Sequence, residues 1–233
     1  MTQVNLTAHR KSAVMNVSEE DHIGRVILKS RRWYEQDLLE DAYQRLRGQG
    51  GYVIDVGAHI GNHTLWFTKV CGLAVVAVEP NLDNAVHLHS HVRMNGKADK
   101  VEIYNVALGA TEGRGRIEPG PEGNTGMARV ELDEGGSVAV VTLDSIAETA
   151  RMFNPERRAA LIKIDVEGSA MDVLAGAVET LERDRPLLYV EGERDEIQAF
   201  LGPKWKCFGQ FGKTPTFGFQ RQGGVGWGAP SGR

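Results

Sequence analysis

The sequence predicts a doubly wound α/β protein, in which a mostly parallel sheet is covered by helices on both faces. Near-continuous apolar runs begin at residues 52, 73, 161 and 187, and strands buried on both faces have this pattern. Helical patterns lie between the runs, and such alternation of strands and helices is typical of a parallel sheet. The connections between these strands are expected to be right-handed.

Composition and charge are those of an ordinary globular domain. The 233 residues are enough for one full hydrophobic core, and the 41% apolar and 25% charged shares exclude a fibrous or disordered class. The net charge of −4 gives no overall attraction to nucleic acid or anionic lipid. Cys71 and Cys207 lack metal-like spacing and are expected to be reduced thiols.

Neither a signal peptide nor a membrane-spanning segment is expected from the sequence. The first 18 residues lack the apolar core of a signal peptide, and no apolar run approaches the roughly 20 residues that span a bilayer. The expectation is a cytoplasmic protein that has a small-molecule substrate and neither a nucleic-acid nor a membrane partner.

A helical N-terminal segment, residues 1–48, is expected to precede the main domain and to act as a lid. Within it, residues 33–46 form a helix that glycines from Gly48 onward stop. The apolar side chains at helical spacing are Leu38, Leu39, Ala42 and Leu46.

The main domain is expected over residues 49–222. Asn81 is predicted to cap a helix after the second strand, and residues 101–108 are rich in β-forming residues. Residues 168–184 are predicted to form one helix after the run LIKIDV. Its apolar stripe consists of Met171, Leu174, Ala177, Val178 and Leu181.

Residues 107–142 break the alternation of strands and helices. They contain many glycines and short β-prone pieces, which predict a β-rich excursion of one or two hairpins over the carboxyl edge of the sheet. Asn124, Thr125 and Gly126 lie in this excursion and are candidates to close over a ligand. Residues 206–220 predict a final antiparallel pair of strands, and residues 223–233 a flexible tail.

The segment DVGAHIGNHT, Asp55–Thr64, links the first strand to a helix and resembles a nucleotide-binding loop. A phosphate-binding loop is excluded because Asn62 and His63 follow Gly61, where Lys and Ser or Thr are required. The dinucleotide pattern G-x-G-x-x-G lacks its middle glycine here, and Asp55 would repel a pyrophosphate.

A cationic ligand fits this loop better. S-adenosylmethionine carries an ammonium and a sulfonium group, so an acid at the end of the first strand favours it. Glu79 ends the second strand, where its carboxylate can accept both ribose hydroxyls of either S-adenosylmethionine or NAD. An NAD-dependent oxidoreductase therefore remains an alternative, as does a non-catalytic module that binds S-adenosylmethionine.

Five motifs, between about Trp33 and Glu191, resemble those of FkbM-type methyltransferases: DVGAHIGNHT, AVEPNLDN, NVALGATEG, VTLDSI and LIKIDVEGSAMDVLAGA. The resemblance implies a seven-stranded class I methyltransferase fold, Rossmann-like, with a C-terminal antiparallel hairpin. It also implies methyl transfer from S-adenosylmethionine, usually to a hydroxyl oxygen. The expected acceptor is a small molecule or a sugar-like compound.

The resemblance assigns roles to individual residues. It places Glu79 at the ribose, and the remaining donor-site residues are Asp55, Gly57, Ala58, Gly61, Asn105, Val106 and Ala107. Glu35, in the segment before the first strand, is a candidate to meet the donor's ammonium group, although a solvated helix face is an alternative.

Asp165 and Glu167 are the preferred candidates for the base that accepts the hydroxyl proton, because ligands sit at strand carboxyl ends in such sheets. Helix capping and a helix-dipole interaction are the alternatives for these two residues. His63 is a further candidate for the base. Ala170 stands where the family often has a second glutamate, and no metal site is predicted; His87, His89 and His91 are expected to be structural or surface residues.

Overall fold

The computed structural model describes residues 1–120, 125–152, 155–212 and 214–223. Its central sheet consists of β3 (Tyr52–Val56), β4 (Ala74–Val78), β5 (Val101–Tyr104), β10 (Ala159–Ile164), β11 (Leu187–Glu191), β12 (Trp205–Phe211) and β13 (Thr216–Arg221). The order of these seven strands is β12-β13-β11-β10-β3-β4-β5. β13 is antiparallel to both of its neighbours, β11 and β12, whereas the other neighbouring strands of this sheet are parallel to each other. The predicted mostly parallel sheet with a C-terminal antiparallel hairpin is confirmed.

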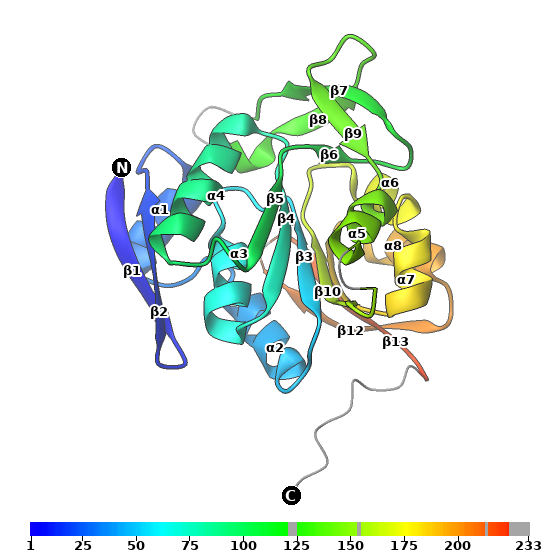
Figure 1. Ribbon diagram of the computed structural model, residues 1–233, viewed down its shortest axis with the longest axis horizontal. Coiled ribbons are helices and arrows are strands. Elements are labelled where there is room, and N and C mark those ends of the chain that lie inside the picture. The colour runs from blue at the N-terminus through cyan, green and yellow to red at the C-terminus, as the bar shows by residue number, and fades with distance from the viewer. Residues whose placement is uncertain (121–124, 153–154, 213, 224–233) are drawn as a thin grey trace, which may run out of the picture.

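Helices cover both faces of this sheet (Figure 1). One face packs on α1 (His22–Ser30), α2 (Gln36–Leu46), α3 (Asn62–Leu65), a π-helical continuation of α3 (Trp66–Cys71) and α4 (Leu82–Met94). The other face packs on α5 (Leu143–Arg151), α6 (Ala170–Ala175), α7 (Val178–Asp184) and α8 (Arg194–Leu201). Alternate residues of a strand enter the two cores, Val53 the first and Ile54 the second, which explains the uninterrupted apolar runs.

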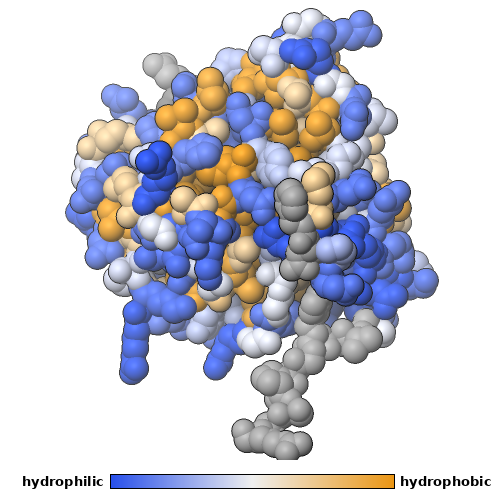
Figure 2. Space-filling model, in the orientation of Figure 1, coloured by the Kyte–Doolittle hydropathy of each residue, from blue (hydrophilic) through white to orange (hydrophobic). Residues whose placement is uncertain are grey.

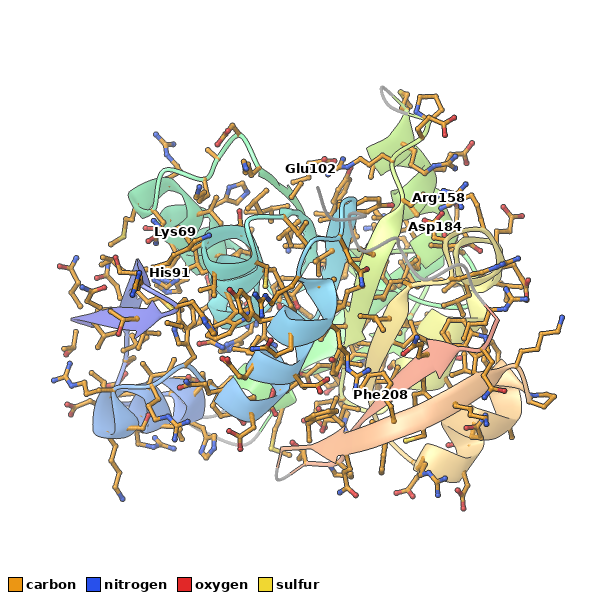
Figure 3. The ribbon with its side chains drawn as sticks, turned by 90° about the horizontal axis from the view of Figure 1, so that it is seen from below. Lys69, His91, Glu102, Arg158, Asp184 and Phe208 are labelled. Carbon is orange, nitrogen blue, oxygen red and sulfur yellow. The ribbon has the colours of Figure 1, made fainter. Side chains whose placement is uncertain are left out.

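The first 17 residues are not helical, so the assignment of residues 1–48 to a helical segment is wrong at its start. They form an antiparallel hairpin of β1 (Thr2–Ala8) and β2 (Lys11–Val17). Val4 and Leu6 are buried between exposed neighbours, the alternation of a half-buried strand. The hairpin is joined to α4 by His91, whose Nε2 lies 3.0 Å from the Asn16 nitrogen (Figure 3).

The helix expected over residues 168–184 is two helices, α6 and α7. A side chain on Gly176, between them, would lie 2.2 Å from the Gly109 carbonyl oxygen, so another part of the chain passes close to the break. The Asp144 carboxylate accepts hydrogen bonds from the backbone N–H groups of Glu179 and Thr180, at 3.0 and 2.8 Å. These bonds satisfy two of the N–H groups that a helix start leaves without a partner, so α7 begins anew.

The described residues of the segment 107–142 form the predicted β-rich excursion. It contains β6 (Ala107–Leu108), β7 (Gly113–Glu118), β8 (Arg129–Leu132) and β9 (Val138–Val141), in the order β6-β9-β7-β8. The strand expected over residues 101–108 is therefore divided between two sheets. The small sheet lies above the central sheet in Figure 1, beyond the ends of β3 and β4, and Figure 2 shows apolar patches in this region among hydrophilic residues.

No helix in the described part of the chain is long and apolar enough to cross a membrane.

Candidate functional site

A cavity of about 360 Å³ lies between the carboxyl edge of the central sheet and the small sheet. Its floor includes the ends of β3, β4 and β11 and the loop that follows β10, while its apolar roof comes from β7, β8 and β9. The roof side chains are Ile117, Val130, Leu132 and Val140. The cavity therefore has one apolar side and one side made of polar strand ends.

Two glycines let the loop after β3 pass close to its neighbours. Gly57 has φ 74°, and a side chain there would lie 1.9 Å from the Asp165 carbonyl oxygen. Gly61 has φ 94°, and a side chain there would lie 2.5 Å from Leu88 of α4. Only glycine tolerates both the left-handed backbone and these approaches. Gly57 lines the cavity, whereas Gly61 allows α3 to pack on α4.

Glu79 follows β4 and holds a fixed carboxylate at the cavity wall. Its Oε2 accepts a hydrogen bond from the His59 N–H at 2.8 Å, and its Oε1 accepts one from the Asn81 N–H at 2.9 Å. Burial raises the pKa of Glu79, while these bonds favour the charged form. Asn84 Nδ2 donates a third, longer bond to Oε1 at 3.5 Å. A carboxylate has about four acceptor positions, so some acceptor capacity remains for a ligand.

Lys163 lies beneath the cavity and joins three groups, although it sits within the apolar strand β10. Its Nζ donates to the Gly57 carbonyl oxygen at 3.0 Å and lies 3.0 Å from Asp165 Oδ2. It is also 3.4 Å from Asp55 Oδ1, while Asp55 Oδ2 accepts a hydrogen bond from the Thr64 hydroxyl at 2.6 Å. The Lys163 ammonium holds the pKa of Asp165 well below its usual range.

Asp55 therefore does not face the cavity, contrary to its assignment as a residue of the donor site. It is fully buried and is not among the residues that line the wall. Its charge acts on Lys163, which in turn holds the Gly57 loop and Asp165. Asp55 thus acts on the lining of the cavity only through Lys163.

Glu35 reaches the cavity from the turn before α2. This residue has φ 52°, and Asn62 fixes the preceding turn by accepting from the Tyr34 N–H at 3.2 Å and donating to the Tyr34 carbonyl at 3.1 Å. Burial and the nearby Asp165 charge raise the pKa of Glu35 to about 7. The segment before the first strand therefore contributes an acid to the site.

His63 stands behind Glu35 and does not line the cavity. Its Nε2 lies 3.4 Å from Glu35 Oε2, and its side chain is almost fully buried. Burial lowers the pKa of His63 to about 4, so the imidazole is neutral at neutral pH. The structure thus places His63 outside the cavity lining.

Two further acids line the cavity at the ends of neighbouring strands. Glu167, which the sequence indicated, has a raised pKa because of burial and the Asp165 charge. Glu191, which sequence analysis did not assign, ends β11 next to Asp165, and its interaction with Asp165 together with burial raises its pKa to about 9. Glu191 ends an apolar strand just as Glu79 follows one, and that shared pattern was the available signal.

The structure brings seven of the predicted residues to the cavity wall: Glu35, Gly57, Glu79, Val106, Ala107, Asp165 and Glu167. Five others do not line it: Asp55, Ala58, Gly61, His63 and Asn105. Asn105 holds the turn between β5 and β6, where its Nδ2 donates to the carbonyl oxygens of Glu79 and Pro80 at 2.8 and 3.0 Å. Its effect on a ligand would therefore be indirect.

The histidine tract on α4 is divided by burial. His91 is buried, with Nδ1 2.7 Å from the Ile60 carbonyl oxygen, whereas His89 is exposed. Among the described residues, no group of three or more His, Cys, Asp or Glu side chains is arranged to hold a metal ion. Of the excursion residues singled out above, Asn124 lies outside the described residues, and Gly126 lines the cavity.

Known proteins share this fold. A solved structure titled methyltransferase FkbM from Methylobacillus flagellatus KT has a TM-score of 0.53 at 16% identity, over 73% of this chain and 43% of that chain. The T. thermophilus 16S rRNA N2 G1207 methyltransferase (RsmC), solved with AdoMet and guanosine, has a TM-score of 0.51 at 13% identity. That match covers 94% of this chain and 50% of that chain. The shared fold is that of the class I S-adenosylmethionine-dependent methyltransferases.

Sequence comparison identifies the family. The hexuronic acid methyltransferase AglP of Haloferax volcanii is 27% identical over 177 residues, which are 73% of this chain. The matched region is 65% of the length of AglP, so the chain spans less than two thirds of this relative. The family described as "Methyltransferase FkbM domain" matches residues 55–218, from the buried acid of β3 to the last strand. The chain belongs to the FkbM family of methyltransferases.

Proposed function

We propose that this protein transfers a methyl group from S-adenosylmethionine to a hydroxyl oxygen of a small, sugar-like acceptor. The observation that carries the proposal is the composition of one cavity. A fixed carboxylate, Glu79, and an apolar roof lie in the same cavity as the acids Glu35, Asp165, Glu167 and Glu191.

The residues present fit this donor. Glu79 would accept the ribose hydroxyls, Val106 and Ala107 would lie beside the adenine, and the acids would face the cationic amino-acid part. The bound donor supplies an electrophilic methyl group on its sulfonium. NAD fits less well, because its pyrophosphate would meet the acids, and Arg129 is the one Arg or Lys side chain among the lining residues that the structure describes.

Glu167 is a better base than Asp165. A stronger base has a higher pKa, and burial with the Asp165 charge raises the pKa of Glu167. Lys163, at 3.0 Å, holds the Asp165 pKa low and so reduces its tendency to accept a proton. We assign proton acceptance from the acceptor hydroxyl to Glu167 and electrostatic stabilisation of the cationic donor to Asp165.

Alignment of the reactants is the second contribution of the site. Holding an acceptor in line with the methyl group can supply up to roughly 7–11 kcal/mol of the barrier. The floor, the turn at Glu35 and the roof enclose the cavity from three sides, which would restrict the orientations of both reactants.

The similarity to AglP supports an acceptor of the sugar class, since that relative is named for methylating a hexuronic acid. A hydroxyl of a sugar ring is a weak acid, so its methylation benefits from a base such as Glu167. We therefore propose O-methylation and place hexuronates and neutral sugars first among the acceptors to be tested.

The test is transfer of isotope-labelled methyl from S-adenosylmethionine to a panel of sugars and glycosides, with products identified by mass spectrometry. The proposal predicts a methyl ether on at least one sugar and loss of that product in Glu167→Gln. Labelled ester or amine products would replace the O-methylation assignment. Donor binding without transfer to any acceptor would favour a non-catalytic module.

A further inference from the structure

The carboxyl groups of Asp165 and Glu191 both line the floor of the cavity, where the two residues follow each other across neighbouring strands. Their strands are parallel neighbours, with Ile164 opposite Val190, so the next residue of each strand stands at the same edge. Two ionised carboxylates at adjacent positions repel each other, so each disfavours ionisation of the other. A proton on one of the two removes this repulsion.

The surroundings place the proton on Glu191. The Lys163 ammonium is 3.0 Å from Asp165 Oδ2 and favours the anion there. Within the described part of the chain no ion pair to Glu191 is found, and the charges of Asp165, Glu167 and Glu35 all oppose its ionisation. Its pKa is raised to about 9, while burial raises the pKa of the neighbouring Tyr34 to about 12, so this phenol stays neutral.

We propose that binding of the cationic methyl donor releases the Glu191 proton to solvent, so that donor binding and ionisation of this carboxyl are coupled. The inference rests on the proposed function, because it requires the donor to occupy this cavity. The Glu191 O–H bond breaks, the proton passes to the buffer, and the new carboxylate faces the sulfonium and ammonium charges of the donor. The cavity then gains a second ionised strand-end carboxylate only when the donor is present.

The pH window separates Glu191 from its neighbour Glu35. At about pH 8, a group with a pKa of about 9 is roughly 90% protonated, whereas a group with a pKa of about 7 is roughly 90% ionised. Proton release at this pH is therefore expected to come from Glu191. Above about pH 10 the release should disappear, because Glu191 is already ionised in the free protein.

The experiment is calorimetric titration at about pH 8 in buffers with different ionisation enthalpies, which gives the number of protons released on binding. The donor's amino group, with a pKa of about 8, takes up part of a proton on binding to either protein, so the parent is compared with Glu191→Gln. We expect the parent to release about 0.5–0.9 proton more than this variant for S-adenosylmethionine, a difference set by the raised pKa of Glu191. The difference should be smaller for S-adenosylhomocysteine, which lacks the sulfonium charge.

A matched control is Asp172→Asn, which changes another acid that lines the cavity. This variant should give the same net number of protons as the parent. Carbon NMR of the labelled Glu191 carboxyl in the ligand-free protein provides a second readout. Its titration midpoint should lie near pH 9.

The outcomes distinguish this inference from the proposed function. Binding of S-adenosylmethionine with the same net number of protons released by the parent and by Glu191→Gln would overturn the coupling and leave the methyltransferase proposal intact. An NMR midpoint between about pH 4 and 5, near the ordinary glutamate value, would overturn it without any donor. Failure of both sulfur ligands to bind would remove the proposed function, and the coupling with it.

Discussion

Replacing Lys163 by methionine removes the one positive charge that the structure places between Asp55 and Asp165. The Nζ atom lies 3.4 and 3.0 Å from these carboxylates and also donates to the Gly57 carbonyl at 3.0 Å. Removing one partner of a buried ion pair typically destabilises a protein by about 3–5 kcal/mol. We expect the lower end, because the Asp165 side chain is 34% exposed while Asp55 is fully buried.

The expected signature is a fall in the melting temperature at neutral pH. For a domain of this size each kcal/mol shifts the melting temperature by about 2–4 °C, so Lys163→Met should melt roughly 6–12 °C below the parent. The measurement is calorimetric or circular-dichroism melting at about pH 7. Lys206→Met changes an exposed lysine on another strand, β12, and should leave the melting temperature nearly unchanged.

The pH dependence of the stability difference between Lys163→Met and the parent is a second, independent test. In the parent, the depressed pKa of Asp165 contributes stability above its unfolded value of about 4, and this stability is lost as the pH falls further. In Lys163→Met the Asp165 pKa rises, so the variant gains stability relative to the parent as the pH falls from about 7 to about 4.5. Equal melting temperatures at pH 7, or a gap that widens on acidification, would refute the assignment of Lys163 as the cation of this site.

Three other substitutions test individual parts of the cavity. Glu79→Ala removes charge-assisted bonds worth roughly 1.5–3 kcal/mol each, so donor affinity should fall at least tenfold, with circular dichroism verifying the fold; unchanged affinity would place the ribose elsewhere. Gly57→Ala should destabilise the protein more than Gly72→Ala, because both have positive φ but only Gly57 has backbone within 1.9 Å of the added carbon; equal melting temperatures would contradict this. Glu167→Gln should lower turnover by about 10²–10⁴ with donor affinity kept within a few-fold, and a parent-like single-turnover rate would exclude it as the base.

The central sheet was predictable because its strands are buried on both faces. The strands β3, β4, β10 and β11 each begin within two residues of the start of an apolar run in the sequence. The N-terminal hairpin was not predicted, because the pattern of alternate buried residues over Thr2–Val17 is short, and its burial depends on packing against α4. The break between α6 and α7 also depends on distant residues, namely the Asp144 carboxylate and the Gly109 carbonyl.

Acids of the site were partly predictable for a topological reason. The carboxyl ends of parallel strands meet at one edge, so Glu79, Asp165 and Glu167 were expected to lie near one another, and all three line the cavity. The sequence did not show how deeply each acid is buried at that edge. Asp55 was expected beside the ligand but lies beneath the wall on Lys163, and an apolar run containing one lysine does not show which buried acids the lysine will meet.

His63 was predicted at the site but does not line the cavity, whereas Glu191 lines the cavity but was not predicted. Glu35 separates His63 from the cavity because the turn before α2 has positive φ, which no local pattern indicates for a glutamate. Glu191 becomes a partner of Asp165 only through the register of β10 with β11.

Calorimetric binding of S-adenosylmethionine, S-adenosylhomocysteine and NAD to the purified protein tests the central claim most directly. The composition of the cavity, with Glu79 at one end and acids in place of anion-binding groups at the other, predicts micromolar dissociation constants for both sulfur ligands. It also predicts no measurable binding of NAD at the same concentrations. Micromolar affinity for NAD, together with no heat from either sulfur ligand, would contradict the account.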